Sequence, residues 1–260
     1  MECLRAEHTE VWAASRNLPL AHFADRTHSI AATGLDLMGL AGVEPPATLL
    51  EELNGFDSIV SWYGTNRPEF REAVARLPFQ FLPAIPPRGS GLHAADFYLR
   101  QAAGVTQCSA EAIPRLGCRR EEEGFAVIHP FSGSLKKNWP LERYQELDRL
   151  LARRLPVKWI VERRTRGVEG VDLAPPIDDL YELACWLARS RFYLGNDSGI
   201  THLAAAAGTR VLALFGPTDP AVWAPRGPDV RVISTSRPEE PMASISVEEV
   251  VATIRGMCPG

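Results

Sequence analysis

The stretch "FYLGNDSGITHLAAAAGTRVLALF", residues 192–215, carries the clearest fold signal in the sequence. It begins as an apolar strand, passes through small polar residues into an alanine-rich helix, and ends in a second apolar strand. Gly208 stands after the helix, where glycine commonly ends a helix in the left-handed conformation. A strand, a helix and a strand in immediate succession predict two parallel strands joined by a helical crossover.

The same alternation of short strands and helices continues on both sides of this stretch, and it predicts an α/β protein with parallel sheets. A polar segment around residues 116–124 interrupts it, so we expect two domains, residues 1–118 and residues 119–260. In the first we expect strands at 9–14, 57–63 and 79–82 and helices at 67–77 and 93–104. In the second we expect strands at 125–130, 157–162, 192–197, 210–216 and 230–235 and helices at 140–154, 177–190, 200–207 and 246–257.

Charge and composition restrict the ligands and the compartment that the sequence fits. The net charge is −4, which argues against general nucleic-acid binding. Residues 1–118 hold 9 Lys and Arg against 13 Asp and Glu; of the totals of 28 and 32, this leaves 19 of each for residues 119–260. We therefore expect an anionic ligand on the second domain. Five dispersed cysteines, a charged start and no apolar run long enough for a membrane span favour a soluble cytoplasmic protein.

The loops after the strands of the second domain are the expected binding region, because ligands of parallel α/β sheets bind beyond the carboxyl ends of the strands. The first such loop is "HPFSGSLKKNWP", residues 129–140. Ser132, Gly133 and Ser134 are small enough to let backbone N–H groups approach a phosphate, and Lys137 adds a mobile positive charge. A plain polar loop with a solvated lysine is the alternative.

The junction at residues 197–202 is the second expected contact. Ser198 and Gly199 leave the first N–H groups of the helix uncovered, and these groups with the helix dipole form an anion site. Asp197 precedes them, and His202 is expected to be buried in the first turn on the face of Ser198. The alternative is an ordinary N-cap, in which Asp197 or Ser198 satisfies two amides and binds nothing.

Other loops and motifs restrict the ligands, cofactors and reactions that the sequence fits. Glu162 follows a predicted strand, where a carboxylate can bind a ribose diol or remain a solvated charge. The segment "GSGLHA", residues 89–94, resembles a dinucleotide motif but follows a proline-broken segment, so a nicotinamide cofactor is not expected. The sequence has no P-loop, no nucleophile elbow and no D-x-D pair for a divalent metal. We therefore expect no metal site and no cofactor.

The segments "NDSGITHLAAAAGTRVLALFGPTDPAVWAPRG" and "HPFSGSLKKNWPLERYQELDRLL" resemble the two donor-site segments of the bacterial heptosyltransferase family, glycosyltransferase family 9. The resemblance is close over residues 125–260 and loose over residues 8–118. It implies the GT-B architecture of two Rossmann-like domains. It also implies an inverting transferase that moves a heptose-like sugar from a nucleotide diphosphate, typically ADP-heptose, to an acceptor hydroxyl in lipopolysaccharide or another cell-surface glycan.

The resemblance also assigns roles to individual positions. Lys137 and Asp197 correspond to the residues that stabilise the leaving group and the donor, without a metal. The whole implied donor site comprises Ser132, Gly133, Ser134, Lys137, Glu162, Asp197, Ser198, Gly199 and His202. The implied partners are the nucleotide-sugar donor and a glycan or glycolipid acceptor, with peripheral contact at the inner membrane and no nucleic acid.

The first residues depart from the family pattern. Members of the family open with a strand and a Gly-Asp loop, whose aspartate is thought to deprotonate the acceptor, and "MECLRAEHTEVW" resembles the segment that follows these. The expected N-terminal domain is therefore incomplete, and the catalytic base is not among these residues. A nucleotide-sugar-binding protein with little or no transferase activity is thus one alternative. A nucleotide-sugar epimerase of the same architecture is another.

Overall fold

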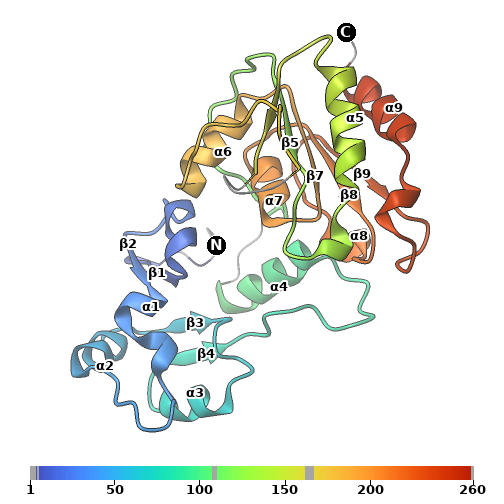
Figure 1. The fold of residues 1–260 in the computed structure, drawn as a ribbon. Helices are drawn as coiled ribbons and strands as arrows, with labels where there is room; N and C mark the ends of the chain where they lie inside the picture. Colours follow the sequence, from blue (N-terminus) through green and yellow to red (C-terminus); the bar gives the residue numbers. More distant parts are fainter. Residues whose placement is uncertain (1–3, 5, 107–109, 162–166, 259–260) are drawn as a thin grey trace. The chain divides into compact units, whose positions relative to one another are not determined.

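The computed structural model describes residues 4, 6–106, 110–161 and 167–258. The chain divides into two compact units, Met1–Ala110 and Glu111–Gly260, and each contains parallel strands joined by helices (Figure 1). The predicted α/β class with parallel sheets is confirmed. The division between the units falls earlier in the chain than the boundary at 118 and 119 that the sequence suggested.

The second unit is built on a five-stranded sheet in the order β6-β5-β7-β8-β9, with every neighbouring pair parallel. Both faces of such a sheet are covered by helices, so its strands are continuous apolar runs. Accordingly β7 and β8 are buried at every position. The strands are β5 (Ala126–His129), β6 (Val157–Trp159), β7 (Phe192–Asn196), β8 (Val211–Phe215) and β9 (Val230–Ser234).

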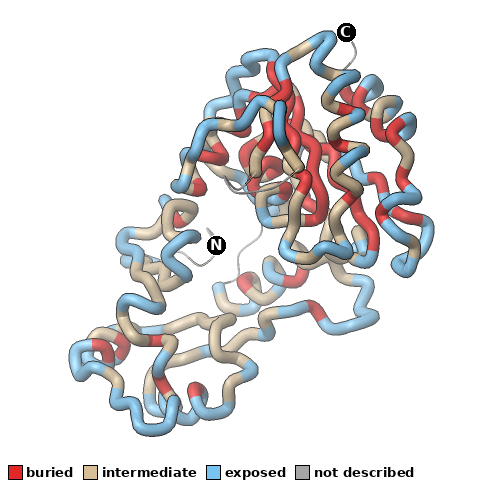
Figure 2. The backbone as a smooth tube through the Cα atoms, viewed as in Figure 1, coloured by how far each residue is buried: buried red, intermediate tan, exposed pale blue. Residues whose placement is uncertain are grey.

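Helices cover the two faces of this sheet. Helices α5 (Leu141–Leu151) and α9 (Val247–Met257) lie side by side on one face, and α6 (Leu180–Ala188) and α7 (Gly199–Ala206) cover the other (Figure 1). A short helix, α8 (Pro220–Trp223), follows β8. The buried residues concentrate along the strands between these layers (Figure 2). In the described part of the chain, no helix is both long and apolar enough to cross a bilayer.

Helix α7 owes its position to small residues and to its two ends. The Ser198 side chain accepts a hydrogen bond from the Thr201 amide and so caps the N-terminus. Ala204 and Ala205 have no exposed surface, which lets the helix backbone approach the sheet closely. Beyond the helix, Gly208 adopts a φ of +84°, which confirms the predicted left-handed stop.

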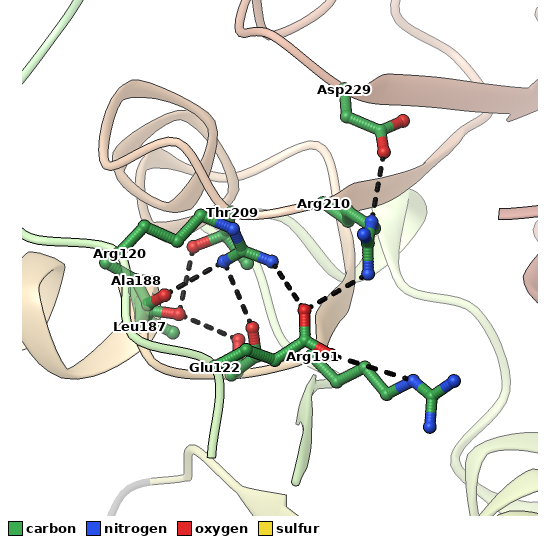
Figure 3. Close-up of polar contacts among 9 residues, drawn as sticks. Arg120, Glu122, Leu187, Ala188, Arg191, Thr209, Arg210 and Asp229 are labelled. Atoms are coloured by element: carbon green, nitrogen blue, oxygen red, sulfur yellow. Dashed lines mark hydrogen bonds and ion pairs between the residues drawn. The ribbon is translucent and has the colours of Figure 1, made fainter. Parts of the chain in front are cut away.

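A network of charged groups holds the start of the second unit against the amino ends of its strands (Figure 3). Arg120 donates to the carbonyl oxygens of Ala188 (2.8 Å) and Ser190 (3.2 Å), which precede β7. Arg210 pairs with Glu122 (3.2 Å) and with Asp229 (3.3 Å), which precedes β9. These contacts fix the starts of three strands and leave their opposite ends available to a ligand.

The first unit contains two separate two-stranded parallel sheets, β1-β2 and β3-β4, around a small core that includes Phe70 and Val74. The sequence pattern did not predict β2, α1 and α2. The reason is visible for β2, whose sequence "RTHS" has no apolar alternation. The elements are β1 (Glu10–Ala13), β2 (Arg26–Ser29), α1 (Ile30–Thr33), α2 (Ala47–Asn54), β3 (Ile59–Ser61), α3 (Pro68–Ala73), β4 (Phe79–Phe81) and α4 (Ala94–Thr106).

Candidate functional site

The topology of the second unit changes direction between β5 and β7, and their carboxyl ends lie at this switch point. From β5 the chain passes through α5 to β6 on one side, whereas β7 pairs with β5 on the other side. From β7 the chain passes through α7 to β8, in the opposite direction across the sheet. Ligands of open α/β sheets bind where the connections from two adjacent strands diverge in this way. The residues that follow these two strands, 130–139 and 197–202, are the two segments that the sequence singled out.

A buried amide fixes the first of these segments against the second. Asn196, at the end of β7, has no exposed surface. Its Nδ2 donates to the carbonyl oxygen of Pro130 (2.7 Å), and its Oδ1 accepts from the amide of Trp139 (3.0 Å) and the hydroxyl of Tyr144 (2.9 Å). Both ends of the loop after β5 are thereby tied to one side chain.

Lys137 and Asp197 form the charged centre of the site. Lys137 lies in a short 3₁₀ turn, η4 (Leu135–Lys137), and its Nζ is 2.6 Å from Oδ2 of the buried Asp197. His202 Nε2 lies 3.9 Å from Oδ1 of the same carboxylate. Burial alone would raise the pKa of Asp197, but the neighbouring polar side chains of His202, Lys137 and Thr218 and the charge of Lys137 lower it to about 2. Asp197 is therefore ionised at neutral pH and orients the ammonium group.

The N-terminus of α7 lies directly beside this ion pair in the sequence. Ser198 is the N-cap residue and Gly199, the first helical residue, is exposed. The first amides of a helix have no partner within the helix, and the dipole gives them partial positive charge. A cationic side chain and a helix N-terminus at one sheet edge make an environment suited to a phosphate group.

Beneath Ser198 lies a cluster of polar side chains that the sequence analysis missed. His129 Nδ1 is 3.1 Å from the hydroxyl of Tyr193 and 3.3 Å from Oγ of Ser198. Thr201 Oγ1 is 3.1 Å from the Tyr193 hydroxyl and 3.0 Å from Ser198 Oγ. Gly195 makes room for this cluster, because a Cβ there would lie 2.6 Å from the Tyr193 hydroxyl. That glycine between two strand residues was the available signal in the sequence.

The predicted site residues are only partly brought together. Lys137, Asp197 and His202 meet, but His202 is not buried as expected, since 45% of its side chain is exposed. This is a correction: α7 begins at Gly199 and turns that position toward solvent. Ser132 uses its hydroxyl within its own loop, 2.8 Å from Asn138 Oδ1 and 2.9 Å from the Ser134 carbonyl. Gly133 is exposed in the same loop, and Glu162 lies outside the described residues.

One group of side chains in the described residues has the composition of a metal site. Glu10, His28 and Glu52, all in the first unit, offer ligand atoms within 4.8 Å of one another. Glu10 already has close neighbours: its Oε1 is 3.0 Å from His8 Nε2 and 3.4 Å from Arg26 Nη1, and its Oε2 is 2.9 Å from His28 Nε2. The guanidinium of Arg26 pairs with this carboxylate, and we assign the group no metal.

Comparisons with known proteins identify the family. Residues 90–250 match Glycosyltransferase family 9 (heptosyltransferase), and the chain belongs to that family. Lipopolysaccharide heptosyltransferase 1 of Salmonella typhimurium is 29% identical over 128 residues, which is 45% of this chain and 39% of that protein. The same enzyme of Escherichia coli K12 is 30% identical over 131 residues, 46% of this chain and 40% of that protein. The chain thus matches about two fifths of the length of these relatives.

Solved structures of heptosyltransferases share the fold. An E. coli heptosyltransferase solved with ADP has a TM-score of 0.62 and 17% identity, covering 96% of this chain and 100% of that one. The E. coli ADP-heptose lipopolysaccharide heptosyltransferase II has a TM-score of 0.69 and 17% identity, covering 95% and 88%. The predicted fold class, that of the GT-B heptosyltransferases, is confirmed.

Proposed function

We propose that the second unit binds a nucleotide sugar through its diphosphate. We further propose that the protein transfers a heptose-like sugar from ADP-heptose to an acceptor hydroxyl in lipopolysaccharide core or another cell-surface glycan. The observation that carries the proposal is the arrangement of Lys137, Asp197 and the N-terminus of α7 at the carboxyl ends of β5 and β7. Membership of the heptosyltransferase family supports the reaction. The choice of nucleotide is supported by the structural neighbour that was solved with ADP.

The chemistry that the site would provide is stabilisation of a leaving group. When the bond from the anomeric carbon to the diphosphate breaks, negative charge develops on the phosphate oxygen that leaves. Preorganised positive groups aimed at such charge lower the barrier. Lys137 supplies a full charge and α7 supplies partial charges from its first amides. Since Asp197 is ionised, it holds the ammonium in place, and a divalent cation is not required for this role.

Calorimetric titration of the whole chain with ADP, ADP-heptose, UDP and GDP tests the binding step. We expect ADP and ADP-heptose to bind. The double variant Lys137→Ala, Ser198→Val should weaken binding by at least about tenfold, since a hydrogen bond from Lys137 to a charged phosphate contributes about 1.5–3 kcal/mol and Ser198→Val also removes the cap of α7. Lys136→Ala is the matched control, because this neighbouring lysine is exposed and should leave affinity unchanged. Failure of all four nucleotides to bind, or unchanged binding by the double variant, would refute the site.

The transfer step needs a separate assay, in which release of ADP from ADP-heptose is measured with and without a lipopolysaccharide core acceptor. Acceptor-dependent release supports the transferase. ADP release without an acceptor would instead identify a hydrolysing enzyme, and loss of ADP-heptose without ADP release, followed by chromatography, an isomerising one. We propose a cytoplasmic location at the inner face of the membrane, where such an acceptor is accessible, and fractionation of cells that express the chain tests this.

A further inference from the structure

The polar cluster beneath Ser198 has no role in the binding or leaving-group steps described above. His129, the last residue of β5, faces two hydroxyl groups through a single ring atom, Nδ1, at 3.1 Å from Tyr193 and 3.3 Å from Ser198. Burial lowers the pKa of His129 to about 4, so the imidazole is neutral at physiological pH. A neutral ring presents either an N–H or a lone pair at Nδ1, and the neighbouring groups restrict the choice.

The hydrogen atoms of the cluster can be assigned in sequence. The Thr201 hydroxyl donates to the carbonyl oxygen of Asn196, which can only accept, so Thr201 Oγ1 must accept from its other neighbours. The hydroxyl groups of Tyr193 and Ser198, 3.1 and 3.0 Å away, both donate to it. Ser198 Oγ accepts from the Thr201 amide. Since both hydroxyl hydrogens are used in this way, Nδ1 of His129 carries a hydrogen and donates to the oxygens of Tyr193 and Ser198.

We propose that His129 is a positioning residue of the donor site, which acts through Ser198. Its Nδ1–H donates to the Ser198 oxygen that caps α7, and so helps to hold the first turn of the helix with its free amides available to a phosphate oxygen of the donor. This rests on the proposed function, because it assigns a role toward the diphosphate of a nucleotide sugar. The ring touches neither the donor nor the reacting atoms, and its effect is on the orientation of the side chain above it.

The test is a double-mutant cycle for ADP affinity, measured by calorimetry on the whole chain. His129→Leu removes the ring nitrogen and should weaken ADP binding about five- to tenfold, the value of one neutral hydrogen bond. Ser198→Ala should weaken it by a similar factor. If His129 acts through Ser198, then His129→Leu should have no further effect when Ser198 is already alanine. His129→Asn, which can place an N–H where Nδ1 stood, should restore affinity, whereas His129→Gln should not.

A control variant distinguishes a specific effect on ADP affinity from a general loss of stability. Thr209→Val removes another buried hydroxyl, which donates to the Leu187 carbonyl (2.9 Å) at the opposite end of α7 (Figure 3). It should lower the melting temperature and leave ADP affinity unchanged.

Three results would overturn the inference. They are ADP binding unchanged by His129→Leu, effects of His129→Leu and Ser198→Ala that simply add, and a loss in His129→Asn equal to that in His129→Gln. Should His129→Leu not fold, the Asn and Gln variants decide. If the unmodified chain does not bind ADP, the proposed function itself fails and this inference with it; that outcome is distinct from binding which is insensitive to position 129.

Discussion

Replacing Asn196 by leucine should release the loop that carries Lys137, because one buried amide holds both ends of this loop. The substitution keeps the four side-chain heavy atoms and the branch at Cγ, adds some volume, and removes every polar atom. It breaks the contacts to the Pro130 carbonyl, the Trp139 amide and the Tyr144 hydroxyl, at 2.7, 3.0 and 2.9 Å. Trp139 and Tyr144 are 1% and 0% exposed, so water cannot replace the lost partner without opening the core.

The magnitude follows from the number of groups left without partners. An unsatisfied buried donor or acceptor costs about 1–3 kcal/mol, and three groups are affected. The three costs do not simply add, because the surrounding structure relaxes and the Trp139 amide and the Tyr144 hydroxyl share one acceptor. We therefore expect a loss of about 3–6 kcal/mol in the free energy of unfolding. This is a large fraction of the roughly 5–15 kcal/mol that stabilises a typical domain.

Urea denaturation, followed by tryptophan fluorescence and circular dichroism, measures the change. A second variant sharpens the test. Tyr144→Phe alone should cost about 1 kcal/mol, but it should cost nothing or stabilise when residue 196 is leucine, because the hydroxyl that it removes is already without a partner. Glu146→Gln, at an exposed position of α5, is the control. A loss below about 1 kcal/mol for Asn196→Leu, or an equal cost of Tyr144→Phe in both backgrounds, would refute the reasoning.

Three further predictions concern the same edge of the sheet. Gly195→Ala should lower the free energy of unfolding by about 1–3 kcal/mol, because its Cβ would lie 2.6 Å from the buried Tyr193 hydroxyl and 3.0 Å from the His129 carbonyl oxygen; an unchanged denaturation midpoint would contradict this. Since the pKa of His129 is lowered from 6.5 to about 4, its contribution to stability should be complete above pH 6.5. It should be lost as the pH falls toward 4, by roughly 3 kcal/mol, and denaturation at several pH values should show this dependence in the wild type and not in His129→Asn. ADP affinity should be the same in EDTA as in magnesium, because Lys137 and α7 supply the positive charge; restoration of binding by magnesium alone would show this assignment to be wrong.

The parts of the fold that sequence could predict are those with continuous apolar strands and capped helices. Residues 192–215 form β7, α7 and β8 as expected, because buried strands and an alanine-rich helix permit few alternatives. The first unit was harder to predict, since β2 consists of four mostly polar residues. It forms a strand by pairing with β1, and that pairing is not encoded in a local pattern.

The candidate site shows the same distinction between local and long-range information. Ser198 and Gly199 could be placed because capping is a local property of the chain. The pairing of Lys137 with Asp197 joins residues 60 positions apart, and the sequence suggested only that their loops share a sheet edge. The positions of His129 and Asn196 could not be inferred, because their partners come from several elements. His202 was misplaced because helical periodicity gives its face of α7 but not the solvent exposure of that face.

The position at which a nucleotide diphosphate binds is the central claim, and a crystal structure of the chain grown with saturating ADP measures it directly. We expect the diphosphate at the carboxyl ends of β5 and β7. Its oxygens should lie within hydrogen-bond distance, about 3 Å, of Lys137 Nζ and the first amides of α7. ADP bound elsewhere on the chain, with neither Lys137 nor the α7 N-terminus in contact with a phosphate, would contradict the central claim.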